Sequence, residues 1–323
     1  MTQSRSALAP AEIAAIVAIV VIWGVNNAAV KISTESLPPL LTGALRFGLA
    51  ALCLAWFVRP PFPNGKSLAL LVLLGGPIHF ALIYLGFSMA HDVTPLSVSL
   101  QLWIPMTALF AFLLLGERIS VPAVLGMLIA FFGIAWMVLD AHAFVDLPAI
   151  MIGVGASVAW ALTTVIARRT RAVSPMKMQG LLAMVTFPVL LLGSLTFETG
   201  QVAAMQEAPP LAWGAVAFSA LMSTVVATGL VFWLVQRREA GRVTPYLLAT
   251  PVVSMLVGWG LMDDVLTPQI LTGAALTLIG VAIVALAERG LGGGGGGGGA
   301  GGEGGKKKKK KRRKKKRTHG AQT

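Results

Sequence analysis

One stretch of this chain, residues 95–137, recurs in outline between residues 245 and 284. Each copy contains an apolar run broken by a proline, a short acidic turn, a second proline, and an apolar run with two glycines seven residues apart. The aligned pairs are Pro105 with Pro251, Glu117 with Asp263, Pro122 with Pro268 and, after one added residue, Gly126 with Gly273 and Gly133 with Gly280. A spaced internal copy indicates duplication, and in an apolar chain it is typical of membrane transporters built from two related halves.

The composition is that of a membrane protein. The 323 residues are 56% apolar and 12% charged, with a mean hydropathy of +0.78, whereas soluble domains carry about 25% charged residues. The net charge of +13 comes mostly from residues 306–317, which hold 12 of the 26 Lys and Arg. The only cysteine, Cys53, excludes an internal disulfide and argues against a metal cluster. We expect no metal and no cofactor.

Ten apolar runs are long enough to cross a bilayer, which takes about 20 residues per helix. They are residues 11–31, 38–58, 67–90, 94–115, 121–140, 148–167, 177–197, 210–235, 244–262 and 268–287. The first run has no small-residue cleavage site, so we expect it to be retained rather than removed as a signal peptide. The sequence therefore predicts an all-α polytopic membrane protein with ten transmembrane helices.

The loops between these runs alternate in charge. Basic residues gather in one set, namely Arg5, Arg59, Lys66, Arg118, Arg168, Arg169, Arg171, Lys177, Arg237, Arg238, Arg242 and Arg289, and in the other set only Lys31 breaks the pattern. The positive-inside rule then predicts that both termini are cytoplasmic. Because five is an odd number of spans, the halves, residues 11–140 and 148–287, are predicted to be inverted repeats with alternating access around a central site.

Residues 292–323 form a separate tail. Its first part is nearly all glycine and predicts a flexible, disordered linker. The basic run that follows predicts a solvated segment attracted to anionic membrane lipids. A nucleic-acid partner is not expected on a chain with ten spans.

The order of short motifs along residues 11–287 resembles the drug/metabolite transporter superfamily, in its EamA-domain branch. The motifs are Trp23-Gly24-Val25-Asn26, Arg46-Phe47, Leu85-Gly86-Phe87-Ser88-Met89-Ala90, and Gly116-Glu117-Arg118 before Pro122 and Gly126, with Trp160-Ala161, Pro251 and Gly273 in the second half. Within that branch the chain is similar to the YddG-type exporters of amino acids, aromatic ones especially. The resemblance implies an inner-membrane carrier that exports small organic metabolites.

Aromatic and polar residues near mid-span are the candidates for a substrate site. They are Trp23, Asn26 and Asn27 in the first span, Gln101 and Trp103 in the fourth, Trp160 and Thr163 in the sixth, and Tyr246 at the start of the ninth. Asn26, Asn27 and Thr163 follow a tryptophan by three or four positions, so they lie close to its face of the helix. The tryptophans either line a cavity or pack as apolar bulk, and the amides either line it or join helices.

His79 is the most pointed candidate, two residues after Pro77 in the third span. Ionisable residues at this depth are functional by default, although a lone histidine is often hydrogen-bonded packing. Pro77, Pro105 and Pro251 are expected to kink their helices and to act as bending points for gating.

Arg46 leaves three interpretations open. Its side chain extends outward to the membrane surface, pairs with a neighbour such as Glu35, or binds a substrate carboxylate. Every Asp and Glu lies in a loop or at the edge of a span. This favours neutral, zwitterionic or aromatic substrates over strong cations, and transport without obligatory proton coupling.

Two other functions are weaker readings of the sequence. A membrane-embedded enzyme needs a nucleophile–base pair or a metal set at depth, and the spans contain neither. A nucleotide-sugar or sugar-phosphate antiporter of the same superfamily is expected to need two or more deep cations, and only Arg46 qualifies. The chain is therefore expected to be a monomeric carrier of small molecules rather than an enzyme.

Overall fold

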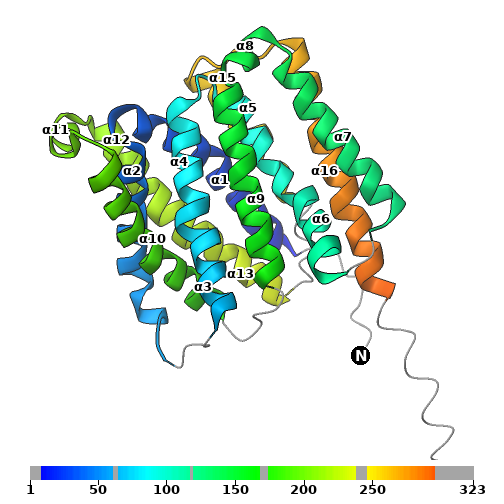
Figure 1. Ribbon diagram of the computed structural model, residues 1–323, viewed down its shortest axis with the longest axis horizontal. Coiled ribbons are helices and arrows are strands. Elements are labelled where there is room, and N and C mark those ends of the chain that lie inside the picture. The colour runs from blue at the N-terminus through cyan, green and yellow to red at the C-terminus, as the bar shows by residue number, and fades with distance from the viewer. Residues whose placement is uncertain (1–8, 61–64, 117–118, 168–173, 238–245, 295–323) are drawn as a thin grey trace, which may run out of the picture.

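The computed structural model describes residues 9–60, 65–116, 119–167, 174–237 and 246–294, and the regular elements in these residues are helices (Figure 1). The first half contains α1 (Pro10–Ser36), α2 (Pro39–Leu54), η1 (Ala55–Phe57), α3 (Lys66–Leu73), η2 (Leu74–Ile78), α4 (His79–Met89), α5 (Val93–Ser99), η3 (Leu100–Leu102), α6 (Trp103–Leu115) and α7 (Val121–Val138). After α8 (Ala141–Val145) come α9 (Leu147–Ala167), α10 (Pro175–Phe197), α11 (Gln201–Glu207), α12 (Pro210–Phe218), η4 (Ser219–Ala227), α13 (Thr228–Arg237), α15 (Thr250–Leu261) and α16 (Pro268–Gly294).

Nine of the ten predicted spans correspond to long apolar helices. In the described residues, nine helical stretches are long and apolar enough to cross a membrane. The expected span 244–262 corresponds to the shorter apolar helix α15, and residues 238–245 lie outside the described part of the chain. The apolar pattern did not predict the short helices α8 and α11.

The predicted tail differs at its start. Helix α16 continues through Gly294, so the first residues of the expected linker are helical. The remaining tail, residues 295–323, lies outside the described residues, as do most of the basic residues used to assign the orientation.

Prolines and backbone capping explain where many of these helices begin. Proline occupies the first or second position of α1, α2, α7, α10, α12 and α15, where its missing N–H costs no hydrogen bond. Inside a helix a proline removes the bond to the carbonyl four residues back. Accordingly, Pro77 lies in the π-helical segment η2, and Pro105 follows the 3-10 segment η3.

Pro251 differs from the expected mid-helix kink. It lies in the first turn of α15. A non-helical turn at residues 248–249 separates α15 from the helical residues 246–247. The helix is therefore broken before the proline. Pro251 has no N–H to donate to the carbonyl four residues earlier, which lies at the end of the preceding helical residues.

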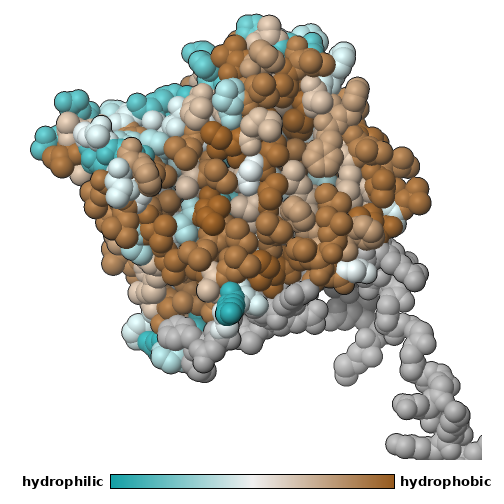
Figure 2. Space-filling view, in the orientation of Figure 1, coloured by the Kyte–Doolittle hydropathy of each residue, from teal (hydrophilic) through white to brown (hydrophobic). Residues whose placement is uncertain are grey.

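Apolar side chains cover the middle of the molecule on the outside as well as the inside. Figure 2 shows apolar residues across the centre of the visible face and hydrophilic residues along its upper edge. Leu52, Leu195 and Phe197 are among the large apolar side chains that are more than half exposed. A surface of this kind fits contact with lipid rather than water.

The glycines of the internal copy meet in space. Helices α7 and α16 lie side by side (Figure 1). Their backbones approach so closely that a Cβ added to Gly126 would lie 2.7 Å from the Gly280 carbonyl oxygen, and one added to Gly133 would lie 2.7 Å from that of Gly273. Small residues permit this approach, and helix pairs in membranes are held by such packing.

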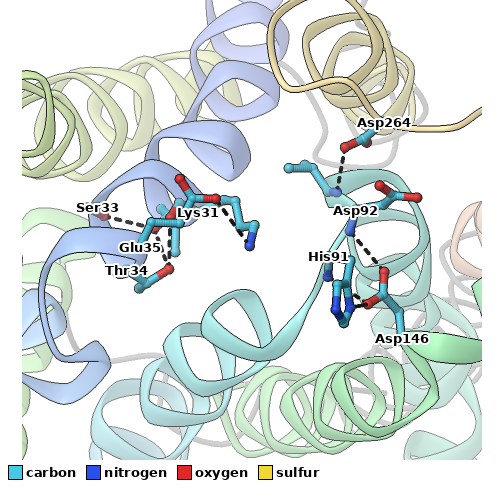
Figure 3. A network of polar contacts seen from close by, with 10 residues as sticks. Lys31, Ser33, Thr34, Glu35, His91, Asp92, Asp146 and Asp264 are labelled. Carbon is cyan, nitrogen blue, oxygen red and sulfur yellow. Dashed lines mark hydrogen bonds and ion pairs between the residues drawn. The ribbon is translucent and has the colours of Figure 1, made fainter.

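Carboxylates from two loops cap the start of α5 on one face of the molecule. Asp264 accepts hydrogen bonds from the backbone N–H groups of Val93 (3.0 Å) and Thr94 (2.9 Å) at the start of α5. Asp146 accepts from the backbone N–H groups of His91 and Asp92 (Figure 3). Partial burial, together with the negative charges of Asp264 and Asp146, raises the pKa of Asp92 to about 6.

Another carboxylate makes similar bonds at the start of α2. Glu198, after α10, accepts hydrogen bonds from the backbone N–H groups of Leu40 (2.7 Å) and Leu41 (3.1 Å) at the start of α2. A carboxylate at a helix N-terminus is stabilised by the helix dipole and by the free N–H groups there. Glu198 and Asp264 belong to the second half, and each accepts hydrogen bonds from the start of a helix in the first half.

We predict that Gly133→Ala destabilises the protein. The added methyl would lie 2.5 Å from the backbone nitrogen of Thr277, and such overpacking typically costs about 1–3 kcal/mol. The measurement is the thermal unfolding midpoint of the purified protein in detergent. Gly214→Ala in α12 is the matched control, because nothing lies within 4 Å of its added methyl and Ala is the better helix former. Equal midpoints for the two variants would contradict the close α7–α16 contact.

Candidate functional site

Seven buried or half-buried side chains meet near the middle of four membrane-length helical segments. We call them the central cluster: Arg46, Phe47, His79, Phe80, Trp160, Ser223 and Thr224. They come from α2, α4, α9 and the π-helical segment η4. Two of these segments belong to each half of the chain, so the cluster is a place where the halves meet.

Arg46 makes the connection between the halves. Its side chain is 5% exposed. Its Nε donates a hydrogen bond to Thr224 Oγ1 (3.0 Å), and one terminal nitrogen donates to Ser223 Oγ (3.3 Å). Both hydroxyls are buried. A charge in α2 is therefore held by neutral hydroxyl groups of η4.

Aromatic rings surround the same guanidinium. Its central carbon lies 5.4 Å from the centre of the Phe47 ring and 5.3 Å from that of Phe80. The two rings are themselves in edge contact, with centroids 4.4 Å apart. Cations within about 6 Å of a ring centre are attracted by the electron density of its face, so the rings partly compensate the buried charge.

This arrangement corrects two of the expectations for Arg46. Its side chain neither extends to the surface nor pairs with Glu35. Glu35 instead forms an ion pair with Lys31 on its own helix, at 3.3 Å (Figure 3). The third interpretation, a bond to a substrate carboxylate, is not tested by these contacts.

His79 lies against Phe80, with ring centroids 4.8 Å apart, and also contacts Trp160. The rings of His79 and Trp160 have centroids 4.8 Å apart and are tilted by 33°. His79 Nδ1 lies 2.8 Å from the carbonyl oxygen of Ala156 on α9. Because a carbonyl only accepts, Nδ1 carries the proton, and a neutral ring keeps Nε2 as an acceptor.

Segments with π-helical hydrogen bonding lie next to the cluster in both halves. The segment η2 ends directly before His79, and η4 contains Ser223 and Thr224. Such segments are rare in proteins, and those that occur are often found at functional sites, where the backbone is locally less regular. In η2, Gly75 leaves the space that the side chain of Thr163 occupies.

The other predicted site residues are placed as follows. Thr163 is buried next to η2, and its hydroxyl donates to the carbonyl of Ala159 in its own helix. Asn27 donates from Nδ2 to Ser254 Oγ (2.9 Å) and thereby joins α1 to α15. Asn26 is buried, and its Oδ1 has no hydrogen-bond partner in the described part of the chain.

Four predicted residues have no recorded contact with the central cluster among the described residues. Trp23 packs with apolar side chains of α13 and α15, and Trp103 packs against the apolar core formed by α6, α7, α9 and α16. Gln101 is half-buried in η3. Tyr246 is 51% exposed. Their roles in binding stay predictions.

Sequence reasoning did not join Arg46 to its hydroxyl partners, and it missed the contribution of Phe80. Ser223 and Thr224 stand out as polar residues in an apolar run, but they are 177 and 178 residues from Arg46. The cost of a charge in the membrane signals that Arg46 must have partners, yet it does not name them. In the described residues, no group of three or more His, Cys, Asp or Glu side chains is placed to hold a metal ion.

A protein-family model for the EamA-like transporter family matches residues 10–139 and 147–286. The chain belongs to this family of transporters. It is accordingly a transporter and not an enzyme, as the sequence predicted. The two matched ranges differ by one residue at each end from the predicted halves.

Curated relatives resemble the chain over most of its length. It is 26% identical over 278 residues to the "Probable amino-acid metabolite efflux pump" of Escherichia coli (strain K12), covering 82% of this chain and 91% of the relative. The protein of the same name in Salmonella typhimurium is 28% identical over 279 residues, with the same coverage. The "Uncharacterized inner membrane transporter YedA" of Escherichia coli (strain K12) is 26% identical, covering 85% of this chain and 90% of the relative.

A solved crystal structure shares the fold. It matches this chain with a TM-score of 0.60 and 19% sequence identity, covering 87% of this chain and 98% of the other. At this identity the likeness concerns the fold alone.

We predict that Thr224→Val lowers the stability of the transporter. Valine has the shape of threonine but removes the hydroxyl that accepts from Arg46, and loss of a bond to a buried charged group costs about 1.5–3 kcal/mol. Thr196→Val is the control, since the Thr196 hydroxyl is exposed and bonds only to carbonyls of its own helix. The unfolding midpoint in detergent should fall for Thr224→Val alone. A similar fall for both variants would mean that the arginine contact contributes nothing specific.

Proposed function

We propose that this chain is a multi-pass inner-membrane carrier that exports small organic metabolites, chiefly amino acids, aromatic ones included. The names of the two efflux-pump relatives and of YedA support the direction, the substrate class and the membrane. The observation that carries the proposal is the central cluster, which combines a buried cation, hydroxyl groups and aromatic rings from both halves. Amino acids present matching carboxylate, polar and ring groups.

The two halves, residues 11–140 and 148–287, are proposed to be inverted five-helix repeats. In the internal copy Gly126 corresponds to Gly273, and Gly133 corresponds to Gly280. A symmetric pair of halves that places Gly126 against Gly280 must therefore also place Gly273 against Gly133, and both contacts are present. A twofold axis between α7 and α16 requires this relation. The packing of the other helices supports it too, since α9, α12 and α15 are the counterparts of α1, α4 and α6. Helices α4 and α6 of the first half pack on α9, and their counterparts α12 and α15 pack on α1.

Both termini are proposed to be cytoplasmic on the charge pattern of the loops. The carboxylate-capped face that includes Asp146, Glu198 and Asp264 would then be the outer face. The basic tail would lie at the cytoplasmic leaflet, where anionic lipids attract Lys and Arg.

Alternating access would move the halves about the central cluster. Interruptions at η2 and η4 lie in corresponding helices of the two halves, and the breaks before Pro105 and Pro251 form a second corresponding pair. Pro77, Pro105 and Pro251 therefore mark the proposed bending points. Broken helices around a central site are typical of transporters that work in this way.

Transport is proposed to need no obligatory proton exchange. The central cluster contains no carboxylate, and its one imidazole is that of His79. Nδ1 of His79 is already engaged by the Ala156 carbonyl, which favours a structural role for the ring.

The test is transport by the purified protein in liposomes, using a panel of labelled amino acids with and without an imposed pH gradient. We expect downhill flux of aromatic amino acids that is unchanged by the gradient and retained in His79→Ala. Empty liposomes give the background rate.

Three outcomes would change the proposal. Uphill accumulation driven by the pH gradient, and lost in His79→Ala, would make the protein a proton-coupled exporter. Exchange of sugar phosphates or nucleotide sugars would assign it to the antiporters of the superfamily. Transport of none of the amino acids would exclude the substrate class.

A further inference from the structure

The guanidinium of Arg46 is buried without a negative partner. In the described part of the chain no Asp or Glu forms an ion pair with it, and Glu35 pairs instead with Lys31. Its recorded hydrogen bonds go to two neutral hydroxyls, one of them at the long distance of 3.3 Å. Taking a charge out of water is expensive, and a pair of neutral acceptors offsets it only in part.

A second buried polar side chain packs within about one helical turn of Arg46. Tyr84, on α4, is 1% exposed, and its hydroxyl has no hydrogen-bond partner among the described residues. The Tyr84 ring packs against Gly43, one helical turn before Arg46 on α2, and Tyr84 follows Phe80 by one turn on α4. A buried hydroxyl without a partner costs free energy. Within the described ranges, Arg46 and Tyr84 therefore both have N–H or O–H groups without a hydrogen-bond acceptor, and they lie on neighbouring turns of α2 and α4.

We propose that Arg46 binds the carboxylate of the transported amino acid and thereby selects carboxylate-bearing substrates over their uncharged or amine counterparts. This rests on the proposed function. A guanidinium forms paired hydrogen bonds with a carboxylate that are stronger than those with neutral acceptors. The substrate carboxylate would compete with Ser223 and Thr224 for the N–H groups of Arg46 and would offer an acceptor to the Tyr84 hydroxyl.

The rings around Arg46 fit the remainder of such a substrate. Phe47 and Phe80 lie against the guanidinium, and the contact of His79 with Trp160 continues the aromatic surface away from it. A substrate whose carboxylate meets Arg46 would have ring faces available for its side chain. Because Arg46 belongs to the first half and its hydroxyl partners to the second, carboxylate binding would also weaken a bond between the halves.

The experiment compares substrates that differ only at the carboxylate. Uptake of labelled phenylalanine into liposomes is measured in competition with unlabelled phenylalanine, with phenylalaninamide, which lacks the carboxylate, and with hydrocinnamate, which lacks the amine. The proteins are the wild type, Arg46→Gln, Arg46→Lys, and the control Arg59→Gln. Arg59 is an exposed arginine just beyond the end of the span that contains Arg46, and its guanidinium stacks on Trp56 at 3.8 Å.

In the wild type and in Arg59→Gln we expect phenylalanine and hydrocinnamate to compete about tenfold to a hundredfold better than the amide, as the loss of a charged hydrogen-bonded pair implies. In Arg46→Gln this preference should disappear. Arg46→Lys keeps the charge but not the paired geometry, so its preference should be intermediate. If Arg46→Gln does not fold, the lysine variant and the wild-type competition decide.

The failures are distinguishable. Wild-type transport of phenylalanine with equal competition by the amide, or a preference that survives in Arg46→Gln, overturns the role of Arg46 and leaves the proposed function intact. Absence of amino-acid transport in the wild type overturns the proposed function, and the role of Arg46 with it.

Discussion

A charged guanidinium buried in an apolar helix bundle is the constraint on which the centre of this transporter depends. Arg46 needs partners at a depth where water is scarce, and it obtains them from Ser223 and Thr224 on η4 and from the faces of Phe47 and Phe80. These contacts join α2 of the first half to the interrupted helix of the second. Because these bonds pair a charge with neutral acceptors, they are weaker than bonds from the same guanidinium to a carboxylate.

The periphery of the bundle is built differently from its centre. Between α7 and α16 the contact is backbone against backbone, through Gly126, Gly133, Gly273 and Gly280, so there is little room for either helix to move. Around the cluster, by contrast, the helices are interrupted by the π-helical segments η2 and η4 and by the 3-10 segment η3. A close-packed edge beside an irregular centre is consistent with motion that is confined to the helices around the site.

Much of the architecture was predictable because membrane helices leave a strong pattern in sequence. Long apolar runs gave the spans, and the matching prolines and glycines revealed the duplication that the family model also follows. His79 and Trp160, both predicted for a central site, are in contact, and their role in binding stays a prediction. Trp23 and Trp103 also lie near the middle of their predicted spans, but their rings pack in other apolar clusters. The position of a residue along a span does not determine which face of the helix it occupies.

The remainder depends on contacts between distant residues. Nothing local to Arg46 identifies Ser223 and Thr224 as its partners, and Glu35 was the plausible alternative until Lys31 on the same helix was seen to bind it. The π-helical segments also lack a reliable local signal, because the extra residue in the turn is accommodated by packing. Likewise, the caps formed by Glu198 and Asp264 depend on the approach of loops from the second half to helix starts in the first.

The central claim is that both halves contribute to one binding site at Arg46. The most direct test is an experimental structure of the transporter with a bound aromatic amino acid. The account predicts the substrate carboxylate within hydrogen-bond distance of the Arg46 guanidinium and its ring against Trp160, with the bond from Arg46 to Ser223 or Thr224 lengthened. A substrate bound away from α2 and η4, with both of those bonds intact, would contradict it.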